Sequence, residues 1–173
     1  RGGRSIALRP EATASIVRAY IENSLNQPPG VVKLFYIGPM FRGERPQKGR
    51  QRQFHQIGVE AMGSDSPLLD AEVISLAARF LEKLGIEKFN IRINNLGCHK
   101  DKLAIIGRYR EMLKPYLKGL CDECKLRFEK NILRIFDCKD EECKEVVKNI
   151  KAENVLCNEC TDHFNSVKKN LDL

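Results

Sequence analysis

An arginine-rich segment near the N-terminus combines side chains that could bind a nucleotide. Residues 41–56 read FRGERPQKGRQRQFHQ. An arginine such as Arg42 can hold a phosphate or a carboxylate through two parallel hydrogen bonds. An aromatic ring such as Phe54 can stack on a base, which stabilises binding by about 1–3 kcal/mol per base. The segment therefore predicts a binding site for ATP.

Positive charge is concentrated around the same segment. The 173 residues carry a formal net charge of +7, and residues 1–60 hold ten Lys and Arg against four Asp and Glu. A cationic stretch attracts phosphate, whether from a nucleotide or from a nucleic acid backbone. It can equally be a solvated loop that keeps a protein soluble, and charge alone leaves both interpretations open.

The composition is typical of a globular protein, with 42% hydrophobic and 31% charged residues. No apolar run approaches the roughly 18 residues needed to span a membrane. Because the first residues lack a charged and then apolar leader, we expect a cytoplasmic protein. The chain also lacks an initiator Met, and residues 4–8 already alternate like a strand. We therefore expect it to be an internal part of a longer protein.

The seven cysteines are the second set of residues that could do chemistry. Their odd number, without a secretory leader, predicts reduced thiols rather than disulfides. Two C-x2-C pairs have the spacing of zinc ligands. The candidate ligands of a structural zinc ion are Cys121, Cys124, Cys157 and Cys160. The alternative is that each pair lies on one helix face and packs as small apolar groups. Cys98, Cys138 and Cys143 have no predicted role.

A β-hairpin has to position the nucleotide-binding side chains. Residues 31–42 and 53–62 predict two antiparallel strands joined by the polar, arginine-rich loop. Alternation along the second strand puts Phe54, Gln56 and Glu60 on one face, together with a glycine. That face suits a ligand better than a core. His55 lies on the opposite face, and we interpret it as structural.

Further elements flank the hairpin. The pattern predicts helices from Pro10 to about residue 25 and over residues 67–84, the second capped by Ser66. Residues 4–8 and 88–94 predict two more strands. The fold class is therefore α+β.

The pattern of predicted elements also divides the chain into two parts. Residues 1–97 combine sheet and helices, whereas residues 98–173 are mainly helical. We place a domain boundary between them.

The arginine-rich segment resembles motif 2 of the class II aminoacyl-tRNA synthetases, and in detail that of the histidyl-tRNA synthetases. Residues 36–60, YIGPMFRGERPQKGRQRQFHQIGVE, resemble that family nearly from end to end. LRPEAT at residues 8–13 is similar to the family's LRPEGT, with Ala12 in place of glycine. The helix of residues 67–84 and NILRIFDCKD at 131–140 extend the resemblance over essentially the whole chain.

The resemblance implies a role for each matching residue. Arg42 would bridge the carboxylate of histidine and the α-phosphate of ATP, where charge builds during the reaction. Glu44 would hold the adenine end and Phe54 would stack on the adenine ring. Arg50, with Arg52, would meet the outer phosphates. The residues implied for the histidine pocket are Glu11, Thr13, Arg42, Gln56 and Glu60.

The same resemblance implies a fold, a reaction and partners. Residues 1–97 would be part of an antiparallel class II catalytic sheet flanked by helices, and residues 98–173 a helical insertion domain lying against the tRNA. The enzyme would use ATP and Mg²⁺ to join histidine to its tRNA through histidyl-adenylate. It would be a homodimer at full length and would not bind a membrane.

Three family motifs have no counterpart in these residues: motif 1, motif 3 and the LVRGLDYY-type histidine signature. We therefore expect the chain by itself not to activate histidine. One alternative is the regulatory subunit of ATP phosphoribosyltransferase, a synthetase-like protein that binds histidine without making an adenylate. The unbroken phosphate-binding loop argues against it. The other is a zinc-bearing nucleic-acid-binding module, which leaves the first sixty residues unexplained.

Overall fold

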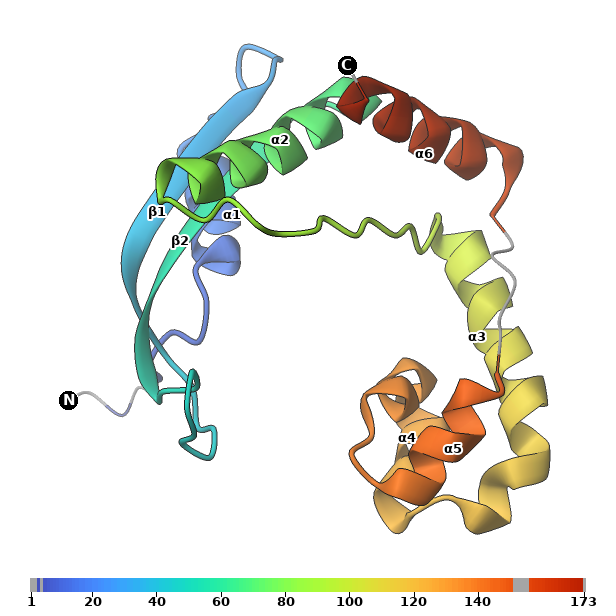
Figure 1. Cartoon of the computed structure of the whole chain (residues 1–173). Helices are drawn as coiled ribbons and strands as arrows, with labels where there is room; N and C mark the ends of the chain where they lie inside the picture. The colour runs from blue at the N-terminus through green and yellow to red at the C-terminus, as the bar shows by residue number, and fades with distance from the viewer. Residues whose placement is uncertain (1–2, 4, 151–155, 173) are drawn as a thin grey trace. The chain divides into compact units, whose positions relative to one another are not determined.

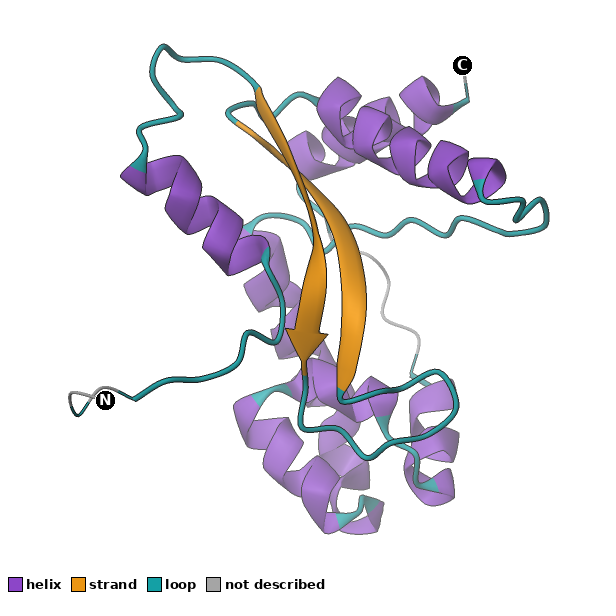
Figure 2. Cartoon of the chain, turned by 90° about the vertical axis from the view of Figure 1, so that its left-hand side faces the viewer, coloured by secondary structure: helices purple, strands orange, loops and turns teal. Residues whose placement is uncertain are grey.

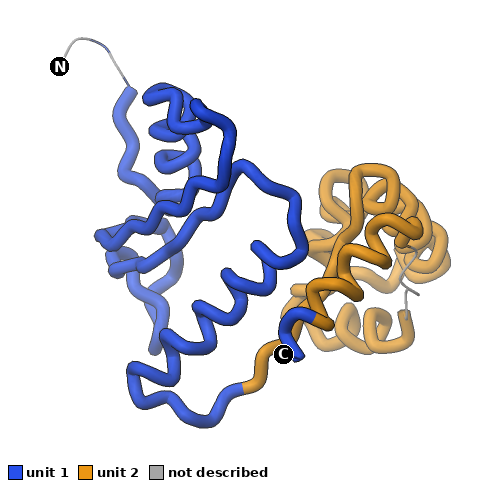
Figure 3. The backbone as a smooth tube through the Cα atoms, turned by 90° about the horizontal axis from the view of Figure 1, so that it is seen from above, with its two compact units in different colours: residues 1–89, 170–173 blue, residues 90–169 orange. Residues whose placement is uncertain are grey.

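The computed structural model describes residues 3, 5–150 and 156–172. Contacts divide the chain into two compact units (Figures 1 and 3). Unit 1 comprises residues 1–89 and 170–173, and unit 2 comprises residues 90–169. The boundary near residue 97, between a catalytic part and an insertion domain, stays a prediction.

Unit 1 is built on the predicted β-hairpin, the two orange strands of Figure 2. Strand β1 (Val32–Phe41) pairs antiparallel with β2 (Gln53–Met62). Beyond β1 the pairing continues by one step, since the Arg42 N–H donates to the carbonyl of Arg52 at 2.8 Å. The predicted strands and their connecting loop are confirmed.

The two additional strands predicted at residues 4–8 and 88–94 are wrong over the described residues. Residues 5–9 and 86–97 contain no strand, and Arg4 lies outside the described part. Alternation shows that a segment has two unlike faces, but a strand also needs a neighbouring strand with free backbone groups. Arg9 comes nearest, because its carbonyl accepts one hydrogen bond from the Phe41 N–H at 2.9 Å.

Two helices complete unit 1. Helix α1 (Thr13–Glu22) begins three residues later than predicted, and a carboxylate oxygen of Glu11 accepts a hydrogen bond from the Ala14 N–H at 3.3 Å. Ala12 has a φ of −118°, so this position does not require a glycine. Helix α2 (Pro67–Lys83) begins as predicted, with the Ser66 hydroxyl accepting from the Leu68 N–H at 3.3 Å.

One face of the hairpin is apolar and exposed. Phe35 and Ile37 of β1 are 74% and 65% exposed, and Ile57, directly opposite Ile37, is 52% exposed. Contiguous exposed apolar surface of this kind is typical of a face that another part of a protein covers. The opposite face of β2 is half-buried and carries the predicted ligand-binding residues.

Gly58 is required on the half-buried face because Tyr36, its partner on β1, lies across it. A Cβ at Gly58 would stand 2.2 Å from Cζ of the Tyr36 ring. We expect Gly58→Ala to destabilise the chain by about 1–3 kcal/mol, because either the ring or the strand must move. Urea unfolding followed by circular dichroism measures the change.

Two further variants make the Gly58 prediction specific. Gly43→Ala adds a methyl group where no described atom lies within 4 Å, so its effect should be small. In a Tyr36→Ala background, Gly58→Ala should lower the free energy of unfolding much less, since contacting residues are energetically coupled. An unchanged cost in that background would show that the ring is not what excludes a side chain.

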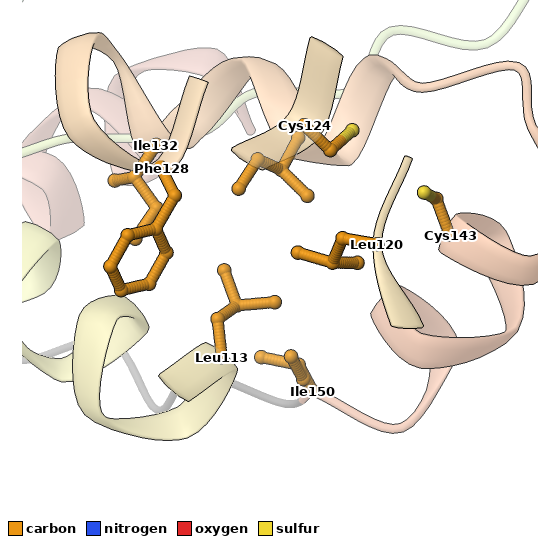
Figure 4. Close-up of a cluster of buried hydrophobic side chains, with 8 residues drawn as sticks. Leu113, Leu120, Cys124, Phe128, Ile132, Cys143 and Ile150 are labelled. Carbon is orange, nitrogen blue, oxygen red and sulfur yellow. The ribbon is translucent and has the colours of Figure 1, made fainter. Parts of the chain in front are cut away.

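The regular elements of unit 2 in the described residues are all helices, as predicted for residues 98–173. Its elements are α3 (His99–Leu113), η1 (Lys114–Gly119), α4 (Asp122–Lys130), η2 (Ile132–Asp137), α5 (Glu141–Lys148) and α6 (Asn158–Leu171), whose last two residues belong to unit 1. The core shown in Figure 4 consists of Leu113, Leu120, Cys124, Phe128, Ile132, Ile135, Cys143 and Ile150. No helix in the described residues is both long enough and apolar enough to cross a membrane.

Candidate functional site

Arg42 is held at the end of β1 by two contacts. Its guanidinium carbon lies 4.8 Å from the centroid of the Phe54 ring, in cation–π contact. Its Nε donates to the carbonyl of Pro10 at 2.9 Å. Neither contact uses the two Nη groups, which are free of these constraints to grip a phosphate or carboxylate. The guanidinium is therefore oriented before any ligand arrives.

Residues 9–13 lie beside the end of β1, although about thirty residues separate them in sequence. The Arg9 carbonyl accepts from Phe41, and Arg9 Nε donates to the Pro39 carbonyl at 2.9 Å. Glu11 and Thr13 belong to the turn and helix start that follow directly. The structure thus brings the LRPEAT segment close to Arg42, a proximity that periodicity alone could not predict.

A hollow of ≈ 550 Å³ opens between the loop and the start of β2. Its lining residues are Arg42, Glu44, Gly49, Arg50, Gln51, Phe54 and His55. All four residues predicted to bind ATP therefore line one hollow. His55 also lines it, which strand alternation did not predict. His55 is exposed and is the third residue of β2, next to the loop.

The charged side chains of the loop are held by weak contacts. Arg50 Nη1 lies 3.5 Å from a carboxylate oxygen of Glu44, and the Arg50 side chain is exposed whereas that of Glu44 is half-buried. Arg52 Nε donates to the backbone carbonyl of Glu44 at 3.2 Å. Surface ion pairs of this kind contribute about 0–1 kcal/mol. A phosphate can therefore draw Arg50 away from Glu44 at little cost.

The predicted histidine-binding face runs along β2. Gln56 lies opposite Gly38, and its side-chain oxygen is buried without a hydrogen-bond partner among the described residues. A buried acceptor left unpaired costs about 1–3 kcal/mol, so this oxygen is suited to receive a donor from a ligand. Glu60 is on the same face, but it lines a separate hollow of ≈ 190 Å³ between β2 and α2.

The two C-x2-C pairs do not come together. The sulfur atoms of one group lie within 4.8 Å of one another, and those residues are Cys121, Cys124, Cys138 and Cys143. A second group, equally close, consists of Cys98, Asp101, Cys157 and Cys160. The structure therefore does not assemble Cys121, Cys124, Cys157 and Cys160 into one site. The spacing rule missed Cys138 and Cys143, which are separated by four residues rather than two.

Neither pair lies wholly on a helix face. Cys121 precedes α4 in extended conformation (φ −61°, ψ 159°), and Cys124 is in the first turn. Cys157 likewise precedes α6, which begins at Asn158. Burial raises the pKa of the Cys124 thiol and raises that of Cys143 to about 11. The backbone N–H of Cys124 lowers the pKa of Cys121.

Comparison with known proteins identifies relatives over the whole chain. The family model for histidyl-tRNA synthetase matches residues 1–118. The histidine–tRNA ligase of Desulforamulus reducens is 51% identical over 173 residues, covering 99% of this chain and 41% of that protein. That of Halothermothrix orenii is 52% identical over 178 residues, covering 100% and 42%.

A solved structure shows the same fold. Apo histidyl-tRNA synthetase from S. aureus superposes with a TM-score of 0.72 at 31% identity, covering 99% of this chain and 40% of that one. The α+β fold and its antiparallel class II sheet are thereby confirmed. This chain spans about two fifths of the length of these relatives. By its sequence and its fold, the chain belongs to the histidyl-tRNA synthetase family.

Proposed function

We propose that the full-length protein containing this chain uses ATP to attach histidine to its tRNA through histidyl-adenylate. The observation that carries the proposal is Arg42, fixed by Phe54 and Pro10 at the edge of a hollow that Glu44 and Arg50 also line. Arg42 is an oriented cation beside an aromatic ring, and Arg50 is a second cation held only by a weak contact. Such a pair suits a nucleoside triphosphate.

ATP would occupy the hollow beside the loop. The adenine ring stacks on the face of Phe54 turned away from Arg42, and the Glu44 carboxylate accepts a hydrogen bond from the adenine amino group. Arg50 leaves its weak pairing with Glu44 and binds the outer phosphates, assisted by Arg52. Mg²⁺ would enter with ATP and offset part of the negative charge of its phosphates.

Histidine would lie between residues 9–13 and the half-buried face of β2. Its ammonium group has three N–H donors, which hydrogen-bond to the unpaired oxygen of Gln56, the carboxylate of Glu11 and the hydroxyl of Thr13. Glu60, which lines the separate hollow beside α2, would favour the ammonium through its negative charge. The histidine carboxylate is then directed toward the Nη groups of Arg42.

The reaction follows from this placement. A carboxylate oxygen of histidine attacks the α-phosphorus, the new P–O bond forms histidyl-adenylate, and pyrophosphate leaves. Negative charge builds on the α-phosphate oxygens, and Arg42 binds that charge more tightly in the transition state than in the ground state. A hydroxyl of the terminal adenosine of tRNA then attacks the histidyl carbonyl, and AMP leaves.

The partners of the full-length protein would be tRNA and a second copy of itself. We place residues 98–173 along the tRNA as an insertion domain and expect a homodimer. The exposed apolar face around Phe35, Ile37 and Ile57 is available for contact with other parts of the full-length protein.

Gln56→Ala in the full-length protein should raise KM for histidine by about 10–100-fold, the cost of one hydrogen bond to a charged group. KM for ATP should stay within about twofold, which provides an internal control for folding. Initial rates of adenylate formation at varied histidine and ATP measure both constants. An equal rise in both would remove Gln56 from the histidine pocket.

Exchange between pyrophosphate and ATP tests the proposed activity. The full-length protein should catalyse this exchange with histidine and with none of the other nineteen amino acids. A protein that binds histidine but shows no exchange would instead be a regulatory relative, such as the subunit of ATP phosphoribosyltransferase. Exchange with a different amino acid would overturn the proposed substrate.

A further inference from the structure

Four cysteine sulfurs from three elements of unit 2 converge at one point. Cys121 and Cys124 stand at the start of α4, Cys138 follows η2, and Cys143 is in the first turn of α5. All four sulfurs lie within 4.8 Å of one another, and those of Cys121 and Cys138 are 3.9 Å apart. All four lie within a segment of 23 residues, from Cys121 to Cys143, and no cysteine of the other group is involved.

These distances match a single tetrahedral metal ion. Zinc binds thiolate sulfur at about 2.3 Å, so four sulfurs around one ion stand about 3.8 Å apart. A disulfide requires about 2.05 Å, much shorter than the spacing between Cys121 and Cys138. A cluster of several irons would hold its cysteine sulfurs farther apart, because its irons and bridging sulfides lie between them.

Two helix N-termini and one backbone N–H lie beside the sulfur atoms. Cys121, Cys124 and Cys143 lie at the N-terminal ends of α4 and α5, where the helix dipole favours negative charge. The Cys121 N–H donates to the sulfur of Cys143 at 3.3 Å. Such outer contacts are usual around ligated sulfur.

We propose that Cys121, Cys124, Cys138 and Cys143 bind one structural Zn²⁺ ion. Binding releases the four thiol protons to solvent and fills all four coordination positions, so the ion has no open position for substrate. This proposal is independent of the synthetase reaction and does not rest on the proposed function.

The ion would stabilise the packing of the small helices of unit 2 against one another. Helices α4 and α5 have only 9 and 8 residues, and η2 has 6. Cys124 and Cys143 lie at one edge of the core with their sulfur atoms turned toward each other (Figure 4). A core this small gains much from a metal, because metal-binding energy in such a unit is folding energy.

The second group is chemically different and provides a matched control. Its fourth member is the carboxylate of Asp101, which is 5% exposed. The two oxygens of Asp101 already accept from the N–H groups of Cys157 at 3.1 Å and Cys98 at 3.4 Å. Asp101 thus joins the starts of α3 and α6, and this role requires no metal.

Elemental analysis of the purified 173-residue chain tests the proposal. We expect about one equivalent of zinc in the wild type, reduced to below about a tenth in Cys121→Ser/Cys138→Ser. The control variant Cys98→Ser/Cys160→Ser should still carry about one equivalent of zinc. Zinc retained in the first variant, a wild type free of zinc after purification with zinc supplied, or iron in its place would each overturn the proposal.

Cobalt(II) substitution in the wild type covers the case in which the first variant does not fold. Unfolding in chelator and refolding with Co²⁺ should give the intense thiolate-to-metal charge-transfer and visible bands of a tetrahedral four-sulfur site, displaced stoichiometrically by Zn²⁺. Chelator alone should lower the helical circular dichroism signal, and zinc should restore it. The absence of a tetrahedral spectrum, or a helical signal that ignores chelator, would contradict a structural ion at these cysteines.

Discussion

Replacing Arg42 by alanine in the full-length protein is expected to lower histidine-dependent exchange between ATP and pyrophosphate by at least about a hundredfold. The guanidinium is fixed by the Phe54 ring and the Pro10 carbonyl before substrates bind, so no reorganisation is needed as charge builds on the α-phosphate. Because this contact strengthens in the transition state, the loss should appear mainly in kcat.

Arg45→Ala is the matched control for Arg42. It removes an exposed arginine from the same loop, but Arg45 does not line the hollow beside Phe54. Its exchange rate should stay within about twofold of the wild type, since remote exposed charges contribute little at physiological salt. Equal losses in the two variants would mean that the loop acts only through its general positive charge.

Phe54→Ala should raise KM for ATP by about tenfold or more, because a stacked base contributes about 1–3 kcal/mol. It should also lower kcat, since Arg42 loses the ring that orients it. Steady-state exchange rates at varied ATP separate the two effects. Phe35→Ala removes the same ring from the exposed face of the hairpin and should leave KM for ATP unchanged. A normal KM in Phe54→Ala would place the adenine elsewhere.

The hairpin and the nucleotide-binding residues were predictable because their signals are local. Strand alternation and a polar loop define β1 and β2 without reference to the rest of the chain. Pairing of the strand ends brings Arg42 close to Phe54, and the short loop between the strands carries Glu44 and Arg50 to the same hollow. Their roles in the reaction stay proposals, drawn from family resemblance and supported by this geometry.

Features that depend on distant segments were harder to predict. The hydrogen bond between Arg42 and the Pro10 carbonyl joins residues 32 positions apart, and no periodicity encodes it. Residues 88–94 alternate like a strand but lack a neighbouring strand among the described residues, so the alternation predicted the wrong element. A local pattern indicates that a segment prefers an extended conformation, whereas strand pairing requires a second strand beside it.

The cysteines show the same limit. C-x2-C spacing drew attention to Cys121 with Cys124 and to Cys157 with Cys160, yet each pair joins a different group. Cys121 and Cys143 come together because two short helices pack around one core. The spacing of cysteines in the sequence gives no information about that packing. The buried Cys143, with 0% exposure, was the residue whose importance the sequence did not show.

A crystal structure of the full-length protein would show whether the hollow beside Arg42 and Phe54 binds ATP for reaction with histidine. ATP should be present together with histidinol, which lacks the carboxylate needed for reaction. We expect the adenine to stack on Phe54 and the α-phosphate to lie within hydrogen-bonding distance of the Arg42 Nη groups. A nucleotide bound away from this hollow, with neither residue in contact, would contradict it.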